Sequence, residues 1–324
     1  MFNLITIGDS VVDNFIVIDE KEAQLQCDLK RQHCLLCLNY ADKIPIGSTG
    51  QSVGGNAANL AVGCRKLGLN TSIVTDLGDD INGMIIKEQL EKHKVNTDLV
   101  KTVPNAETRF AVVLNYHSER TVLSHHVKRN YSLPKLPATE WIYYSSMGEN
   151  FEKLQKNLIV YLKKNKDIKL AINPGSYQLK KKYDHFKQII PFANLIFINK
   201  EEAKAMVGKK STIKTTIKAL HNLGIEQVVI TDGNNGSHAS NGKEIYFMPI
   251  YPIQPVGKTG AGDAFASGFL SALHYNKDIS EAMQWGTANA GGVIQEVGAE
   301  NGLLSKTQVS KLIKKYSKIK PKKI

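Results

Sequence analysis

The chain has 324 residues, of which 42% are hydrophobic and 22% are charged, proportions that are ordinary for a folded globular protein. No apolar run approaches the roughly 20 residues that a membrane-spanning helix needs. Residues 1–8 lack the basic start and the long apolar stretch of a signal peptide. We therefore expect a cytoplasmic protein without a membrane role, folded as a single domain over 1–324.

The formal net charge is +12, and much of the excess lies in the C-terminal segment 305–324. A basic surface permits nucleic-acid binding but does not require it. Tyr316 alone interleaves an aromatic side chain with the lysines of this segment, so a stacking surface for bases is not indicated. We interpret the segment as a solvated last helix followed by a frayed tail, and we expect no nucleic-acid partner.

Apolar runs that end at turn residues alternate with helical patterns through most of the chain. Strands are expected at 2–8, 71–77, 141–145, 169–173, 194–198 and 227–231. Helices are expected at 56–67, 82–93, 149–164, 184–190, 200–207, 213–223, 261–274, 279–297 and 306–318. This alternation predicts a mainly parallel sheet with helices on both faces, an α/β fold in three layers.

Two stretches interrupt the alternation. Residues 15–48 hold β-prone pieces at 15–18 and 34–38 around a polar connection, and 108–123 alternates as a hairpin about a polar turn. Together they predict a small β-sheet that projects from the main domain as a lid, formed from about 14–48 and 107–124.

Four cysteines in so long a chain do not indicate a disulfide scaffold. Cys27, His33, Cys34 and Cys37 form a cluster, but a structural zinc site normally has two Cys-x₂-Cys halves, and this segment has one. We expect reduced, partly buried thiols, with metal binding as the alternative.

The segment 256–265 combines small residues with an acid at the start of a long helix. Without bulky side chains, the backbone N–H groups of Gly260, Ala261 and Gly262 can approach an anion, which a helix N-terminus attracts. Asp263 lies in the same turn, where it could take a proton from an attacking hydroxyl. The alternative for this segment alone is an ordinary helix cap.

A second glycine-rich segment opens the first major helix. Gly54 and Gly55 allow close approach of a ligand, while Asn56 and Asn59 offer neutral donors and acceptors suited to the hydroxyls of a sugar. Asp13 follows the first strand, near the edge where open α/β sheets place their ligands. Each feature alone is equally compatible with a loop or a cap.

From Gly8 to about Leu304 the chain resembles the ribokinase-like, or PfkB, family of carbohydrate and nucleoside kinases. Gly54-Gly55-Asn56 is similar to the segment that grips the sugar in that family, and Thr259 to Phe265 is similar to its C-terminal signature. Two such motifs about 200 residues apart and in this order are more specific than either alone. The resemblance implies that Asp263 is the catalytic base, that the amides of residues 260–262 form an anion hole, and that ATP and Mg²⁺ are required.

The resemblance also assigns expected roles to further positions. Asp13 and Glu149 would contact the acceptor. Asn199 and Glu202 would position the phosphates and Mg²⁺, with Glu202 acting on the metal through water. The remaining nucleotide contacts would come from Thr231, Gly233, Gly236, Lys258, Thr259 and, near the adenine, Asn289. Apart from the resemblance, Arg109 and Arg120 lie in the hairpin expected to cover the site, where they would contact a substrate oxygen or phosphate or, equally, guard a solvated edge strand.

One position departs from the family pattern. Many members carry an Asp that helps to bind an activating monovalent cation, and Gly257 stands in its place here. Our hypothesis is that Lys258 substitutes for the cation or reaches the transferring phosphate, so that activity needs little K⁺. The alternative is that Lys258 points to solvent and backbone carbonyls keep the cation site.

The function expected from these patterns is ATP-dependent phosphorylation of a primary hydroxyl of a ribose- or fructose-like sugar. The alternatives are an adenosine-like nucleoside as acceptor and, less favoured, a non-catalytic binding protein. A nicotinamide-dependent oxidoreductase is disfavoured because Gly8-Asp9-Ser10 is not the Gly-x-Gly-x-x-Gly turn. A homodimer formed through the lid is a further expectation.

Overall fold

The computed structural model describes residues 1–28, 34–117, 119–208 and 211–324. Its large sheet has the strand order β16-β15-β14-β13-β12-β11-β10-β1-β6-β7. These strands are β1 (Phe2–Ile7), β6 (Thr71–Gly78), β7 (Val100–Val103), β10 (Thr139–Tyr144), β11 (Lys169–Ile172), β12 (Leu195–Asn199), β13 (Gln227–Thr231), β14 (Ser237–Ser240), β15 (Ile245–Met248) and β16 (Lys322–Lys323). The strands from β7 to β13 pair in parallel, and β14 to β16 add an antiparallel edge.

The central strands are buried on both faces, which explains their nearly continuous apolar sequences. In the middle of the sheet Ile5 pairs with Ile142 on one side and with Ser72 on the other. Because all these strands run in parallel, their carboxyl ends meet at one edge, where polar residues such as Asp9 and Asn173 follow them.

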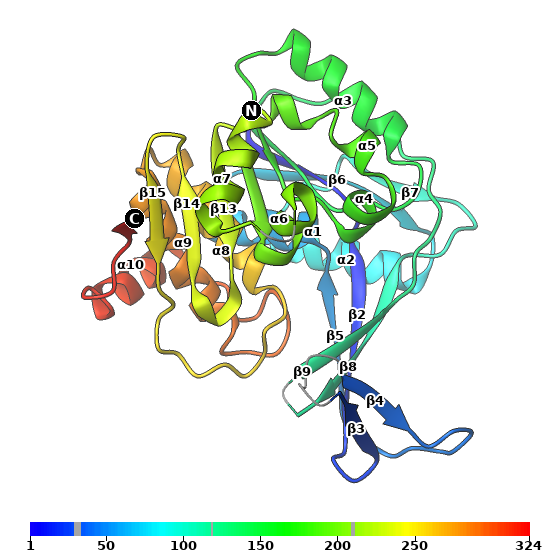
Figure 1. Ribbon diagram of the computed structural model, residues 1–324. Helices are drawn as coiled ribbons and strands as arrows, with labels where there is room; N and C mark the ends of the chain where they lie inside the picture. Colours follow the sequence, from blue (N-terminus) through cyan, green and yellow to red (C-terminus); the bar gives the residue numbers. More distant parts are fainter. Residues whose placement is uncertain (29–33, 118, 209–210) are drawn as a thin grey trace.

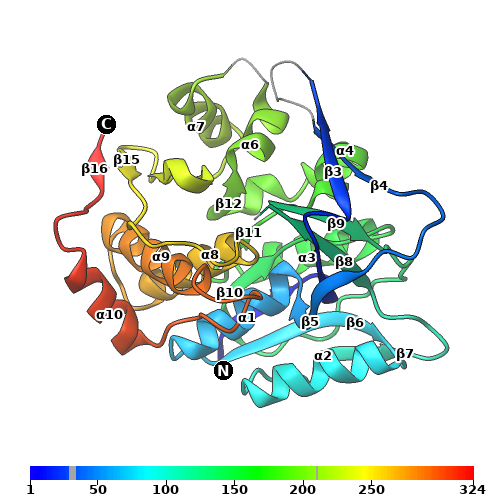
Figure 2. The same ribbon diagram turned by 90° about the horizontal axis from the view of Figure 1, so that it is seen from below.

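Helices cover both faces of the large sheet (Figure 2). The first group is α1 (Asn56–Lys66), α2 (Ile81–Lys92), α8 (Ala261–His274), α9 (Ile279–Val293) and α10 (Lys306–Lys315). The second group is α3 (Glu152–Lys164), α4 (Ser176–Lys181), α5 (Tyr183–Phe186), α6 (Lys200–Val207) and α7 (Ile213–Asn222). The first group packs around Leu60 and Phe269, and the second around Leu158 and Leu220. The three-layer α/β class expected from the alternation of elements is confirmed.

A second, four-stranded sheet extends away from the main body (Figure 1). Its order is β5-β2-β8-β9, with β2 (Val11–Ile18), β5 (Ile46–Gly54), β8 (Phe110–Tyr116) and β9 (Glu119–Ser124). A separate hairpin of β3 (Ala23–Cys27) and β4 (Cys34–Leu38) continues beyond it. We call the four strands the small sheet. Its strand β2 begins just after β1, and β5 runs directly into α1. The small sheet is therefore connected to the large sheet at the edge where the carboxyl ends of the parallel strands meet, which we call the ligand edge.

Several element boundaries differ from expectation. The helix expected over 184–190 is the single turn α5 followed by the 3₁₀ turn Ile190–Phe192, and α9 ends at Val293 rather than at 297. The prediction of a frayed C-terminal tail is also wrong, because β16 pairs with β15. There the N–H of Ile324 donates to the carbonyl of Ile245 and Lys323 pairs with Glu244 at 2.7 Å.

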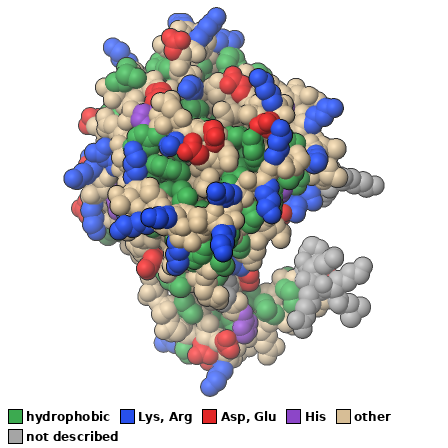
Figure 3. Space-filling view, turned by 90° about the vertical axis from the view of Figure 1, so that its left-hand side faces the viewer, with side chains coloured by type: hydrophobic (Ala, Val, Ile, Leu, Met, Phe, Trp, Pro, Cys, Tyr) green, Lys and Arg blue, Asp and Glu red, His purple; other side chains and the backbone are tan. Residues whose placement is uncertain are grey.

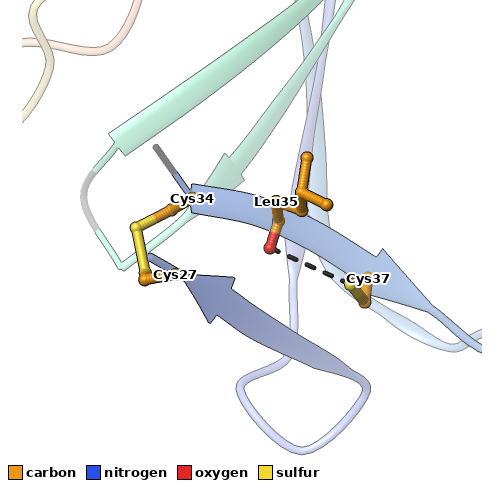
Figure 4. Close-up of a disulfide and its surroundings, with 4 residues drawn as sticks. All are labelled: Cys27, Cys34, Leu35 and Cys37. Carbon is orange, nitrogen blue, oxygen red and sulfur yellow. Dashed lines mark hydrogen bonds between the residues drawn. A yellow bond between two sulfur atoms is a disulfide. The ribbon is translucent and has the colours of Figure 1, made fainter. Parts of the chain in front are cut away.

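The prediction of reduced thiols is corrected for two cysteines. Cys27 and Cys34 face each other across the β3–β4 hairpin and form a disulfide (Figure 4). Cys37 and the buried Cys64 are free. His33, the fourth member of the expected cluster, lies outside the described residues. Among the residues that the structure does describe, no group of three or more His, Cys, Asp or Glu side chains could hold a metal ion.

In the described part of the chain, no helix is both long and apolar enough to cross a membrane. On the face shown in Figure 3, Lys and Arg side chains are spread among acidic and apolar ones and do not form a continuous stripe.

Candidate active site

The helix α8 begins with an open anion-binding turn. Gly260 caps it with φ of 78°, a left-handed conformation that favours glycine, and a Cβ at this position would lie only 2.5 Å from the Cβ of Ala299. No side chain caps the first N–H groups of α8. A Cβ on Gly262 would meet no protein atom within 4 Å, so protein packing does not require glycine there. The backbone N–H groups of Ala261 and Gly262 are therefore free to bind an anion.

Asp263 is held at this turn by one hydrogen bond from α1. The Nδ2 of Asn59 donates to Oδ2 of Asp263 at 2.7 Å, and Oδ1 of Asp263 has no such bond among the described residues. One carboxylate oxygen is thus fixed while the other is available to an incoming hydroxyl. Asn59 thus orients Asp263 through its Nδ2, while its Oδ1 has no hydrogen-bond partner in the described structure; its contact with the acceptor stays a prediction.

Asp13 reaches the same site from the small sheet. It lies on β2 opposite Ser52 of β5, and a Cβ on Gly54 would come within 2.5 Å of its Oδ2. Gly55 has φ of 98°, and a Cβ there would clash with the carbonyl oxygen of Asp9. The two glycines are required to pack the start of α1 against Asp13 and the end of β1.

The electrostatics connect Asp13 and Asp263. Burial raises the pKa of Asp263 to about 6, the hydrogen bond from Asn59 and the charge of Arg120 oppose this shift, and the charge of Asp13 adds to it. Burial likewise raises the pKa of Asp13 to about 6, against the charges of Arg109 and Arg120. Asp13 and Asp263 therefore lie in one site, where both interact with the charge of Arg120. Each carboxyl is mostly ionised above pH 7.

Arg109 and its partners form one side of the site. Its Nη1 lies 3.2 Å from Oδ2 of Asp9, and its Nη2 donates to Oγ of Ser124. The hydroxyl of Tyr131 donates to the other oxygen of Asp9 at 2.7 Å. Arg109 is therefore anchored by a carboxylate and is not a free cation. Tyr131 was not expected from the sequence, since it lies in an irregular stretch with no periodic signal.

Asn56 lies at the first position of α1, and its Nδ2 donates to Oδ1 of Asn173 at 3.3 Å. Asn173 follows β11 at the ligand edge of the large sheet. This residue was missed as a site candidate, although its place immediately after an expected strand was a usable signal.

The expected nucleotide residues meet at the ends of β12 and β13. Asn199 and Thr231 are register partners across these strands. Asn199 also caps α6: its Oδ1 accepts from the N–H of Glu202 at 2.8 Å, and its own N–H donates to Oε2 of Glu202 at 3.1 Å. Burial raises the pKa of Glu202, a backbone hydrogen bond from Asn199 opposes this, and the charge of Asp263 adds to it, so Glu202 lies within electrostatic reach of Asp263.

Gly233 and Gly236 lie in the tight turn that follows β13. Both have positive φ, 51° and 86°, and a Cβ on Gly236 would clash with the carbonyl oxygen of Met248. The turn itself therefore explains Gly236. Gly233 has no protein atom near its missing side chain, which leaves its surface open.

The small sheet contacts the anion-binding turn directly. Nη1 of Arg120, on β9, donates to Oγ1 of Thr259 at 2.7 Å, and Oε1 of the neighbouring Glu119 pairs with Nζ of Lys258 at 2.9 Å. Lys258 thus has a carboxylate partner, which the sequence did not indicate. The sequence is equally compatible with Arg120 as a contact to a substrate oxygen or phosphate and as a guard of a solvated edge strand, and the structure places its guanidinium on Thr259.

Two expected site residues are engaged by other partners. Asn289 is fully buried: its Nδ2 donates to the carbonyl of Ala264 and to Oγ of Ser267, and its Oδ1 accepts from the N–H of Leu304. These bonds fasten α9 to α8, so Asn289 has no free atom for an adenine. Glu149 pairs with the exposed Lys128 at 3.5 Å, and no described contact joins it to Asp13 or Asp263.

Comparisons with known proteins identify the family of the chain. The family model described as pfkB family carbohydrate kinase matches residues 13–306. An ATP-dependent 6-phosphofructokinase of Thermoanaerobacterium thermosaccharolyticum is 24% identical over 296 residues, covering 88% of this chain and 92% of that protein. A ribokinase of Bacillus subtilis is 25% identical over 279 residues, covering 84% and 92%.

Solved structures share the fold. A putative ribokinase II of E. coli, in complex with ATP and Mg²⁺, matches with a TM-score of 0.80 at 17% identity, covering 98% of this chain and 100% of that chain. The nucleoside kinase of Methanocaldococcus jannaschii matches with a TM-score of 0.77 at 21% identity, covering 97% and 99%. With both motifs in place and the family model matching most of its length, the chain belongs to the pfkB family of carbohydrate kinases, enzymes that phosphorylate a hydroxyl group.

Proposed function

We propose that this kinase transfers the γ-phosphoryl group of ATP to a primary hydroxyl of a neutral sugar of the ribose or fructose type. The observation that carries the proposal is the shared electrostatic site of Asp13 and Asp263 beside the open turn of α8. A carboxylate accepts hydrogen bonds from sugar hydroxyls, and the amide of Asn56 at the start of α1 adds a neutral partner.

In the proposed reaction, Oδ1 of Asp263 accepts the proton of the attacking hydroxyl. That hydroxyl oxygen forms a bond to the γ-phosphorus while the bond from this phosphorus to the β-phosphate oxygen breaks, and ADP leaves. Asn59 holds the carboxylate in place through Oδ2. With a pKa of about 6, Asp263 is ionised at neutral pH and can act as the base.

The free N–H groups of Ala261 and Gly262 fit the oxygens of the transferring phosphoryl group, because donors and helix dipole both favour negative charge there. We propose that the guanidinium of Arg120, which is hydrogen-bonded to Thr259, also donates to these phosphoryl oxygens. Oxygen ligands suit Mg²⁺, and we propose that Glu202 and Asn199 hold it through water. Bound Mg²⁺ would neutralise phosphate charge.

On the nucleotide side, we propose that Thr231 and Gly233 contact the phosphates and ribose, since both lie at the open end of β13 beside Asn199. Lys258 is tied to Glu119, so we assign it to closure of the small sheet over the site rather than to the cation position. On this basis the small sheet acts as the lid.

A nucleoside acceptor is the second candidate, supported by a cytidine kinase of Thermococcus kodakarensis that is 26% identical over 256 residues. A panel of ribose, fructose, adenosine, cytidine and fructose 6-phosphate, assayed for ADP release, distinguishes these acceptors. We expect kcat/KM for one neutral sugar to exceed that of every nucleoside at least tenfold. A nucleoside in first place would overturn the sugar assignment, and no turnover with any acceptor would overturn the kinase proposal.

We also propose a cytoplasmic location. The disulfide between Cys27 and Cys34 would then form only under oxidising conditions, because cytoplasmic thiols are otherwise kept reduced.

A further inference from the structure

A concave site lies at the C-terminal end of α1, the helix that contributes Asn59 to the active site. A pocket of about 410 Å³ is formed where α1 and α2 end, at the far end of α1 from Asn56. Its volume falls within the range of small-molecule sites. Five of its lining side chains are basic: Arg65, Lys66, Lys92, His93 and Lys94.

The positive charge of this pocket is largely unpaired. Among the described residues, Arg65 donates to the carbonyl of Leu69 but forms no ion pair, and none is formed by Lys66, Lys92 or Lys94. The C-terminal ends of two helices contribute about half a negative charge each. Four Lys and Arg side chains therefore leave a clear positive excess. By contrast, Lys200 and Lys258 elsewhere in the molecule have carboxylate partners.

A buried carboxylate lies behind this basic cluster. Glu300 is 5% exposed; its Oε2 lies 3.6 Å from Nε2 of His93 and accepts a hydrogen bond from Gln89. Its Oε1 has no hydrogen-bond partner in the described structure. Burial raises the pKa of Glu300 to about 7, and the charges of Lys66 and Lys92 oppose this shift. The lysines of the pocket and Glu300 therefore interact.

Glu300 is also joined to the active site by one residue. The preceding Ala299 packs so closely on Gly260 that no Cβ could fit there. Gly260 caps α8 and sets the direction of its first N–H groups. A change in the position of the 299–300 backbone would therefore move the anion-binding turn.

We infer that the pocket between the ends of α1 and α2 is a second binding site, for a small phosphorylated anion held by Lys66, Lys92 and Lys94, and that its occupancy is transmitted through Glu300 and Ala299 to the turn at Gly260. The phosphate groups would bridge the lysines, with Arg65 and His93 as additional donors. A nucleotide and a sugar phosphate share this chemistry. The transmission rests on the proposed function, whereas the binding does not.

The binding is tested with inorganic pyrophosphate, added without Mg²⁺ at pH 8. The readout is the imidazole resonance of His93 in a ¹H–¹⁵N spectrum, assigned with His93→Gln, because His93 lines the pocket and is remote from Asp263. We expect a saturable shift in the wild type. In the double variant Lys66→Ala/Lys92→Ala, the midpoint should rise about tenfold or more, equivalent to about 1.4 kcal/mol.

The matched control is Lys163→Ala/Lys164→Ala, which removes the basic pair from the last turn of α3, a helix that contributes no residue to the lining of this pocket. This control should titrate like the wild type. An unmoved His93 resonance, or equal midpoints in all three proteins, overturns the site. Titrations with AMP and with ribose 5-phosphate distinguish the two sources: the source that shifts His93 at the lower concentration is the ligand class.

The transmission is tested by the rate of ADP formation at subsaturating ATP. Pyrophosphate competing at the active site would slow the wild type and the double variant equally, so the pocket's contribution is the difference between them. We expect at least a twofold difference. Equal responses overturn the transmission, and a protein that binds pyrophosphate at His93 but forms no ADP overturns the proposed function alone.

Discussion

The pair Asp13 and Asp263 determines how the site responds to pH. Burial raises the pKa of Asp263 and the charge of Asp13 adds to this shift, whereas Arg120 lowers the pKa of both carboxyls. A base must be ionised to act, so activity is lost as pH falls through about 6, the pKa of Asp263.

In Asp13→Asn, the negative charge that raises the pKa of Asp263 is absent. We expect the acid limb of kcat/KM to move to lower pH and to become less steep, because one titrating group remains instead of two. The pH–rate profile from pH 4.5 to 8.5 measures this, with the exposed Asp184→Asn as a control that leaves the profile unchanged. An unmoved limb in Asp13→Asn would show that the two carboxylates do not interact.

Arg120 is expected to act on the transferring phosphoryl group. Arg120→Met should lower kcat by about 100-fold, the cost typical of one lost donor to a developing charge. The assay belongs at pH 8, because loss of Arg120 also raises the pKa of Asp263. Arg120→Lys keeps the positive charge but lacks the planar set of guanidinium donors, so its kcat should lie between those of Arg120→Met and the wild type. A change confined to KM for the acceptor would assign Arg120 to substrate binding instead.

The site residues that could be predicted from sequence are those whose role is indicated by the residues next to them in the chain. Gly260 to Asp263 and Gly54 to Asn56 were found because a helix start and small residues coincide locally. The hydrogen bond from Asn59 to Asp263 could not be foreseen, because the two residues are 204 positions apart in the chain. Asn289 was misplaced for the same reason, since its partners belong to α8 and to Leu304. Tertiary contacts of this kind leave no local pattern.

At the scale of elements, the hairpin of β8 and β9 joins the small sheet to α8. The ion pair of Glu119 and Lys258 is exposed, and exposed pairs contribute roughly 0–1 kcal/mol. The bond from Arg120 to Thr259 is exposed as well, so each contact holds the hairpin at the turn before α8 only weakly. The same hairpin was expected from its alternating sequence, whereas β5 was missed because its polar residues show no apolar alternation.

Two results at this scale concern Lys258. Glu119→Gln should change kcat/KM less than about threefold, because a weak exposed pair is lost.

Replacing K⁺ by tetramethylammonium should alter the wild-type rate less than twofold, since Gly257 offers no carboxylate for a cation. Steady-state assays in both salts measure these effects. Strong K⁺ stimulation would show that a cation site survives on backbone carbonyls.

At the scale of the molecule, the small sheet exposes apolar side chains to solvent. Val17, Val122 and Leu123 are 42%, 50% and 55% exposed. We propose that these residues pack against a second copy of the chain, as the projecting sheet allows. Val122→Lys/Leu123→Lys should then convert a dimer to a monomer in light scattering, while Val160→Lys on α3, at a similarly exposed position, should not. A wild type that is monomeric at high concentration would contradict this.

The three-layer architecture followed from periodicity alone, because alternating elements of these lengths allow few arrangements. The last strand, β16, could not be foreseen. A two-residue strand in a lysine-rich segment is stabilised by its pairing with β15 and not by its own sequence.

The base role of Asp263 is the central claim, and Asp263→Asn tests it most directly. The substitution keeps the shape of the side chain and a partner for Asn59 but removes the proton acceptor. We predict that kcat falls by about 10³-fold, within the range for loss of a general base, while the Kd for ATP, measured by calorimetry, changes less than threefold. Turnover within tenfold of the wild type would contradict the account.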